Sequence, residues 1–259
     1  MPLREYEGAV IYVPRKLWYQ KPGYDDRTIV AEDELPGLSK AIVVLAEPGM
    51  GKTALLARLA KVGGTVSCTA RKLINTHDPA KLVGNATTLI IDALDEVAAN
   101  LEGAAVDRVV QKLDAVGNPP FILSCRVADW QAATSAQTIK EMYGTEPLLV
   151  HLLPLDRGDQ IAILADVVGA TRAEELLAHF EAFDLDLLGN PQTLQMIASL
   201  STAEPLPTTK GDLFEKAIEQ LWCEHREGRG ATEPSREAAL DAAGAAFARD
   251  QQLRDHYET

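Results

Sequence analysis

Short strand-like runs alternate with helical patterns through the first 153 residues of the chain. The runs cover residues 41–45, 65–69, 87–92, 121–126 and 148–152. Between the third and fourth runs, apolar residues recur at helical spacing from Ala105 to Leu113. Apolar strands separated by helices are typical of a parallel sheet covered on both faces. The pattern therefore predicts an α/β fold with a doubly wound, mainly parallel five-stranded sheet.

The pattern changes after Pro154, where the strand-like runs stop. Helix caps and helical spacing predict helices over residues 156–167, 171–183, 191–200 and 212–225, with a further helix from residue 235. We therefore divide the chain into a lead-in segment (residues 1–39), a sheet domain (residues 40–153) and an all-helical subdomain (residues 154–259). Whether a winged-helix region starts near the C-terminus stays open.

The lead-in segment contains one strand-like run, residues 9–13, which Pro14 stops. Two aromatic residues, Trp18 and Tyr19, follow in a polar stretch rich in turn residues. Such residues can pack beside a bound base or cover an edge of the sheet. The second is the commoner fate of single aromatic residues.

The first strand of the sheet domain leads directly into a glycine-containing loop and then a helix. The glycines let backbone N–H groups turn toward an anion, and the helix N-terminus adds the positive end of its dipole. In such a loop Lys52 would lie against the β- and γ-phosphates of a nucleoside triphosphate, and the Thr53 hydroxyl would bind Mg²⁺. We therefore predict that ATP or ADP binds at Glu47, Pro48, Gly49, Met50, Gly51, Lys52, Thr53 and Ala54.

Ala46 departs from the Walker A pattern, which has glycine at the first position of the loop. Alanine is the mildest replacement, but it accepts the turn only if its φ stays negative. We therefore keep the nucleotide site and expect a slightly less open loop. The alternative, a surface turn rich in glycine and proline, leaves the strand before the loop and the helix after it unexplained.

A second group of polar residues follows the strand at residues 87–92. Asp92 ends that strand, where its carboxylate can hold Mg²⁺ through water opposite Thr53. Asp95 and Glu96 come next, and one of them would orient or deprotonate the attacking water. Which of the two is the base stays open, and a solvated acidic loop is the alternative interpretation.

Four segments resemble, in this order along the chain, the motifs of NACHT-type STAND NTPases: residues 46–53, 89–96, 122–126 and 189–191. The specific part is the small residue Ala93 after the metal-binding aspartate, where an ordinary AAA+ chain has glutamate. By this resemblance Arg126 is a sensor arginine near the γ-phosphate, and Pro191 packs on the adenine base. A surface ion pair and an ordinary proline at the first helical position are the alternatives for these two residues.

The resemblance covers about residues 40–225 and implies a nucleotide-dependent switch. Its bacterial members are associated with antiviral defence. Members of this family usually carry an effector domain, a complete winged-helix domain and a long array of repeats, which we do not find in these 259 residues. Whether the chain is a portion of a larger switch or a stand-alone relative stays open, as do its trigger and its effector.

Acidic residues outnumber basic residues 38 to 25, giving a formal net charge of −13. This charge opposes non-specific binding to nucleic acid or to an anionic membrane surface, so we expect a protein partner or self-association on activation. No apolar run approaches the roughly 20 residues that span a bilayer, and no signal core is found. The cysteines Cys68, Cys125 and Cys223 lie in apolar segments without metal-ligand spacing. We therefore expect a cytoplasmic protein with buried, reduced thiols.

Four functions would share these residues. The first is a slowly hydrolysing ATPase switch, with ADP or ATP between the sheet domain and the helical subdomain. The second is a AAA+ motor or loader that turns over ATP steadily as a ring. The third is a P-loop kinase, against which stands the lack of an arginine-rich lid segment. The fourth is a nucleotide-binding scaffold that does not hydrolyse, and the choice between ATP and GTP stays open.

Overall fold

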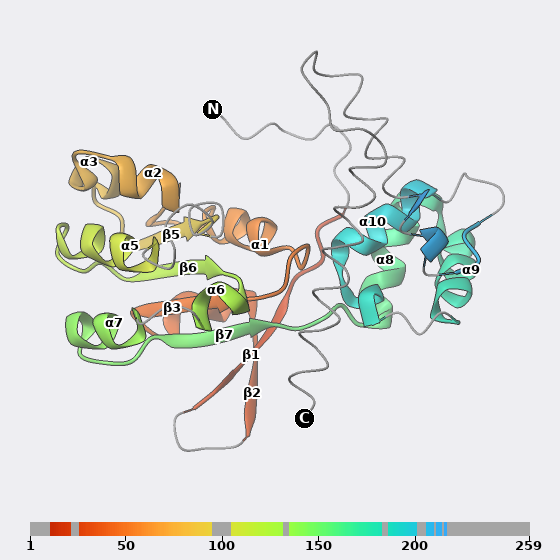
Figure 1. Ribbon diagram of the computed structural model, residues 1–259, viewed down its shortest axis with the longest axis horizontal. Coiled ribbons are helices and arrows are strands. Elements are labelled where there is room, and N and C mark those ends of the chain that lie inside the picture. Colours follow the sequence, from red (N-terminus) through yellow and green to blue (C-terminus); the bar gives the residue numbers. More distant parts are fainter. Residues whose placement is uncertain are drawn as a thin grey trace, which may run out of the picture.

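The computed structural model describes two groups of elements, a sheet with its covering helices and a separate helical group (Figure 1). The described residues are 11–21, 26–94, 105–131, 135–182, 186–200, 206–209, 211–213 and 215–216. The helical group contains α8 (Arg157–Val168), α9 (Ala170–Glu181), η2 (Asp186–Gly189) and α10 (Pro191–Leu200). It lies on the right in Figure 1, beside the sheet domain.

A seven-stranded sheet with the strand order β2-β1-β7-β3-β6-β5-β4 forms the centre of the sheet domain. Its strands are β1 (Lys16–Gln20), β2 (Arg27–Ala31), β3 (Ala41–Leu45), β4 (Thr65–Thr69), β5 (Thr88–Asp92), β6 (Phe121–Cys125) and β7 (Leu148–Leu152). Strands β7, β3, β6, β5 and β4 run parallel, and they are the five strands that the sequence predicts. The hairpin of β1 and β2 is antiparallel and adds to the β7 edge.

The sheet therefore has two strands more than predicted, and the strand of the lead-in segment lies elsewhere. Residues 9–13 were expected to form it, but residues 11–13 are not in a strand, and β1 begins at Lys16. Val13 instead packs against the core of the helical group. Leu17 and Val30 anchor the hairpin because both side chains are buried in the core of the sheet domain.

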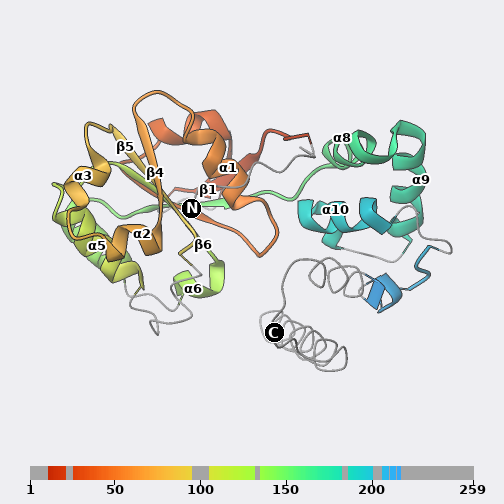
Figure 2. The same ribbon diagram turned by 90° about the horizontal axis from the view of Figure 1, so that it is seen from above.

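Helices cover both faces of the sheet, as Figure 2 shows from above. One face carries α1 (Lys52–Leu59) and the 3₁₀ helix η1 (Glu32–Gly37), and the other carries α2 (Ala70–Asn75), α5 (Ala105–Asp114) and α7 (Ser135–Tyr143). The short helices α3 (Pro79–Val83) and α6 (Val127–Gln131) also belong to this domain. In β3, Ile42 and Val44 pack with α1, whereas Val43 and Leu45 pack with the opposite layer. The strand reads as a continuous apolar run because both of its faces are covered.

Helices α8, α9 and α10 share a core of their own, made by Leu164, Leu176, Leu177, Phe180, Leu194 and Ile197 among others. Asp156 caps α8, as the sequence predicts. Its Oδ1 accepts a hydrogen bond from the N–H of Asp159 at 3.0 Å, and the Asp159 carboxylate accepts one from the N–H of Asp156 at 3.3 Å. This reciprocal pair of bonds is a capping box, which determines where α8 begins.

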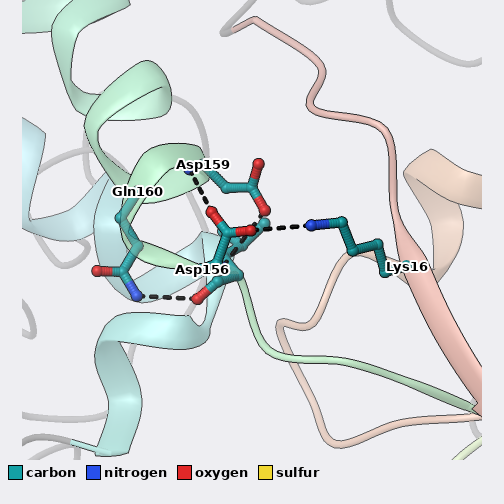
Figure 3. A network of polar contacts seen from close by, with 5 residues as sticks. Lys16, Asp156, Asp159 and Gln160 are labelled. Carbon is teal, nitrogen blue, oxygen red and sulfur yellow. Dashed lines mark hydrogen bonds and ion pairs between the residues drawn. The ribbon is translucent and has the colours of Figure 1, made fainter. Parts of the chain in front are cut away.

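Two residues of the lead-in segment join the sheet domain to the helical group across residues 153–156. The buried Arg15 donates from Nη2 to the carbonyl of Leu153 at 2.7 Å. Lys16 Nζ lies 3.0 Å from Oδ2 of Asp156 (Figure 3). The pKa of the Asp156 carboxyl is lowered, first by the N–H of Asp159 and then by Lys16. The cap of α8 is thus also the partner of a cation on β1.

Glu32 ties the lead-in segment to α1. Its side chain is 7% exposed, and its Oε2 accepts hydrogen bonds from Tyr12 Oη at 2.6 Å and from the N–H of Arg15 at 2.7 Å. Its Oε1 lies 2.7 Å from Nε of Arg58, which belongs to α1. A buried carboxylate with this many donors is well satisfied, so residues 12–15 are held against the first helix of the sheet domain.

Within the parts of the chain that the structure describes, no helix combines the length and the apolar character needed to cross a membrane. The thiols of Cys68 and Cys125 are buried, as predicted. Burial raises the pKa of Cys68 to about 11, which keeps this thiol protonated near neutral pH. Cys223 lies outside the described residues.

Candidate functional site

The loop between β3 and α1, residues 46–51, turns on two glycines. Gly49 and Gly51 have φ angles of 77° and 86°, in the left-handed region that glycine enters without a Cβ clash. Gly51 is the N-cap of α1, so the loop ends at a helix N-terminus. Among the described residues other than glycine, positive φ angles occur at Ala93 and Asn118. The negative φ expected of Ala46 is therefore confirmed.

The ammonium group of Lys52 lies across this loop. Its Nζ donates to the carbonyl oxygens of Ala46 at 2.8 Å and Glu47 at 3.1 Å. A cation and a helix N-terminus therefore meet at one turn of the chain, and both attract an anion. Glycines at the two positions with positive φ place no side chain of their own beside the backbone N–H groups. These features fit the phosphates of a nucleotide.

Three parallel strands bring the other predicted residues to the same edge of the sheet. β6 lies between β3 and β5, and the carboxyl ends of parallel strands share one edge. The phosphate loop follows β3, Arg126 follows β6, and Asp92 ends β5. Thr53 is exposed in the first turn of α1, and Asp92 is half-buried. The arrangement is that of a P-loop NTPase fold.

Ser124, a residue outside the predicted set, holds the carboxylate of Asp92. Ile91 of β5 pairs with Leu123 of β6, so the next residues of the two strands lie side by side. Ser124 Oγ donates to Asp92 Oδ1 at 2.6 Å and accepts from the N–H of Ala93 at 3.2 Å. The serine is 1% exposed. A single hydroxyl in an otherwise apolar strand was the signal that could have identified it.

Ala93 has a φ angle of 58°, in the left-handed region. A residue with a Cβ atom is strained there by about 1–2 kcal/mol. The backbone therefore explains why a small residue follows Asp92, because a larger or β-branched side chain would add to this strain. Asp95 and Glu96 lie outside the described residues, so their catalytic role stays a prediction.

The turn before α10 packs against the phosphate loop. Asn190 Nδ2 donates to the carbonyl of Pro48 at 2.9 Å, and the N–H of Gln192 donates to the carbonyl of Gly49 at 3.4 Å. A Cβ atom on Gly51 would lie 3.7 Å from Cγ of Pro191. Pro191 is thus beside the loop, while its contact with an adenine base stays a prediction.

A cavity of about 340 Å³ lies next to the start of the phosphate loop, and its lining includes Ala46, Glu47, Met50, Trp18, His151 and Asn190. Trp18 and His151 are cross-strand partners on β1 and β7, and their rings stack with centroids 4.3 Å apart and planes 11° apart. Arg27 lies 4.2 Å from the centroid of the Trp18 ring. Burial, and then the charge of Arg27, lower the pKa of His151, so its imidazole is neutral at pH 7. Trp18 belongs to β1, which is paired with β2 on one side and β7 on the other, so it lies within the sheet and lines this cavity, and its packing beside a base stays a prediction.

The predicted magnesium ligands are Thr53 and Asp92. In the described ranges, no three histidine, cysteine, aspartate or glutamate side chains form a group that could hold a metal ion. Mg²⁺ in nucleotide sites commonly takes one or two protein oxygens and completes its shell with waters and phosphate oxygens. A hydroxyl and a carboxylate at one sheet edge therefore fit Mg²⁺ that enters together with a nucleotide.

No profile of a known protein family and no curated protein sequence matches this chain. Solved structures are similar to it at low identity. A Walker-type ATPase of Pyrococcus abyssi is 13% identical with a TM-score of 0.43, and the match covers 76% of this chain and 72% of that protein. Domain III of the replication initiation protein DnaA of Thermotoga maritima is 12% identical with a TM-score of 0.37, covering 81% of this chain and 86% of that domain. The replication initiator DnaA bound to AMPPCP and single-stranded DNA is 14% identical with a TM-score of 0.38, covering 80% of this chain and 72% of that protein. These values are too low to transfer function from those proteins to this chain.

Proposed function

We propose that this chain binds ATP and ADP with Mg²⁺ at residues 47–54 and hydrolyses ATP slowly, as a nucleotide-dependent switch of the NACHT-type STAND class. The observation that carries the proposal is the contact of Asn190 and Gln192 with the carbonyls of Pro48 and Gly49. A ligand shifts a conformational equilibrium only through contacts that differ between the two states. A phosphate loop that touches the helical group directly offers such contacts.

Each residue of the site has a distinct task in this proposal. The loop N–H groups and Lys52 hold the phosphates, and Pro191 packs on the base. Thr53 and Asp92 hold Mg²⁺, which supplies neutralisation of charge on the phosphate oxygens. Arg126 stabilises negative charge on the phosphoryl group, while Asp95 or Glu96 orients the attacking water.

The switch would act through self-association or a protein partner once the nucleotide state changes, in a signalling or antiviral-defence setting. The net charge of −13 supports a protein partner over non-specific contact with nucleic acid. A AAA+ motor would use the same Lys52, Thr53 and Asp92, but as a ring with steady turnover.

Measurements of three properties of the purified chain, nucleotide binding, turnover and assembly, test this proposal. Chromatography of extracted nucleotide and calorimetry with ATP, ADP and GTP measure binding, and phosphate release measures turnover. Light scattering with each nucleotide measures assembly. We expect a mostly monomeric chain that copurifies with adenine nucleotide and turns over slowly. A stable hexamer with continuous turnover would establish the motor instead, and a chain that binds no nucleotide would overturn the proposal.

A further inference from the structure

Asn190 makes two hydrogen bonds with one side-chain amide. Its Oδ1 accepts from the N–H of Gln192 at 2.9 Å, which makes Asn190 the N-cap of α10, with Pro191 at the first helical position. Its Nδ2 donates to the carbonyl of Pro48 in the phosphate loop at 2.9 Å. One half of the amide therefore starts the helix, and the other half binds the loop, 142 residues away in the sequence.

Two glycines at this contact lie where a Cβ atom would come very close to neighbouring side chains. A Cβ atom on Gly49 would lie 2.8 Å from Asn190 Oδ1 and 2.5 Å from Gln192 Oε1. A Cβ atom on Gly189 would lie 2.5 Å from Cβ of Pro154, and the Gly189 carbonyl accepts from the N–H of Leu155 at 2.9 Å. The turn is thus held between the phosphate loop on one side and the linker to the helical group on the other.

Four consecutive carbonyl groups of the loop have donors, and these come from two parts of the chain. Lys52 Nζ donates to Ala46 and Glu47, whereas Asn190 Nδ2 and the N–H of Gln192 donate to Pro48 and Gly49. The half of the loop that contains its first glycine is therefore held by the helical group.

The direction of a carbonyl determines the direction of the next N–H. The peptide unit is planar and trans, so its C=O and N–H bonds point in opposite directions. By binding the Pro48 carbonyl, Asn190 turns the N–H of Gly49 away from the helical group. This N–H belongs to the set that would contact phosphate oxygens.

We propose that Asn190 is a positioning residue of the nucleotide site, which orients the N–H of Gly49 by holding the Pro48 carbonyl and so couples nucleotide affinity to the docking of α10. This inference rests on the proposed nucleotide site. Coupling is reciprocal, so a nucleotide in the loop must tighten the docking of residues 189–194 by the same factor by which that docking tightens the nucleotide.

The test compares Asn190→Ser with Gln195→Ala, a control at an exposed position of α10. Serine is a neutral and effective N-cap, so α10 keeps its start, but its hydroxyl is too short to replace the amide donor on Pro48. We expect ADP affinity to fall by about 5–10-fold, the loss that one hydrogen bond accounts for, and the melting temperature of the nucleotide-free protein to fall slightly, because the same bond joins the loop to the helical group there. Gln195→Ala changes an exposed side chain of α10 outside the site and should bind ADP like the wild type.

Hydrogen exchange supplies a readout that does not depend on activity. ADP should slow exchange of the amides in residues 189–194 in the wild type and in Gln195→Ala, and this effect should shrink in Asn190→Ser. Asn190→Asp, which keeps the capping oxygen but replaces the donor with an acceptor, should lose more affinity than Asn190→Ser and remains a test if the serine variant folds poorly. Wild-type affinity and wild-type ADP protection in the substituted chains would overturn this inference alone. A wild-type chain that binds no nucleotide would overturn the proposed function as well.

Discussion

The hydroxyl of Ser124 donates to the carboxylate of Asp92 across two neighbouring strands, at 2.6 Å. The same oxygen accepts from the N–H of Ala93, so one buried hydroxyl serves both the end of β5 and the turn that follows it. The predicted metal ligand is therefore oriented by a residue on the adjacent strand, as second-layer partners orient ligands at metal sites in general.

Ser124→Ala should lower both stability and magnesium-dependent affinity. The substitution leaves the N–H of Ala93 without its acceptor and Asp92 without this donor, which costs about 1–3 kcal/mol in urea unfolding. In calorimetry, the gain in ATP affinity that Mg²⁺ confers should shrink. Ser67→Ala is the matched control, since Ser67 is exposed on β4. If both serine variants behave alike, the bond to Asp92 has no role in the site.

Ala93→Gly should not destabilise the protein, although glycine usually does. Glycine relieves the left-handed strain at this position, and this gain offsets the larger entropy of the unfolded chain. The exposed Ala57, inside α1, provides the contrast, because Ala57→Gly should cost about 0.5–1 kcal/mol. Thermal unfolding of the two variants measures the difference. Equal losses at the two positions would contradict strain at Ala93.

Lys52→Ala should abolish binding of ATP and ADP. It removes the cation that faces the phosphates, and charge-assisted hydrogen bonds of this kind support a loss of at least about 100-fold. Calorimetry and the nucleotide-induced rise in melting temperature should both show the loss. Lys61→Ala, at an exposed position shortly after α1, should bind normally. Retention of wild-type affinity in Lys52→Ala would remove the nucleotide site from residues 47–54.

Glu96→Gln should preserve nucleotide affinity and slow hydrolysis by roughly 10²–10⁴-fold, the range for loss of a positioned base. Asp95→Asn is the matched comparison, because either acid can fill this role. Phosphate release under saturating ATP separates them. If Asp95→Asn slows hydrolysis and Glu96→Gln does not, Asp95 is the base. Normal rates in both variants would leave the acidic segment without a catalytic function.

Acid should destabilise the protein partly through His151. The folded protein holds this imidazole at a pKa below its unfolded value of about 6.5, so the unfolded chain binds the proton more readily. The contribution of His151 is complete above about pH 6.5 and is lost as the pH falls below that value. Urea unfolding at about pH 7.5 and 5.5 should show a smaller pH effect in His151→Gln than in the wild type. His77→Gln, at an exposed position, should retain the full effect.

The parallel core of the fold was predictable because its strands are apolar on both faces. β3 and β6 are fully buried, so each reads as a continuous run that no surface strand would show. The hairpin was missed because β1 and β2 each have a single buried residue and exposed residues at both ends. Of the run at residues 9–13, the described residues 11–13 are not in a strand, and Val13 packs against the core of the helical group.

The phosphate loop was predictable because its residues are consecutive, and its conformation follows from glycine and from the helix that it starts. The contacts that support this loop could not be predicted from the sequence. Ser124 reaches Asp92 only because β6 lies next to β5 in a definite register. Asn190 reaches Pro48 only once the helical group has docked. The two residues are 142 positions apart in the sequence, so no local sequence pattern indicates this contact.

The two ties across residues 153–156 differ in their response to ionic strength. Lys16 and Asp156 are both exposed, so dissolved salt screens their attraction. Arg15 is buried and binds a carbonyl group instead of a charge, so salt leaves that contact largely intact. The linker between the sheet domain and the helical group is therefore held by one contact that salt leaves largely intact and by another that weakens at high ionic strength.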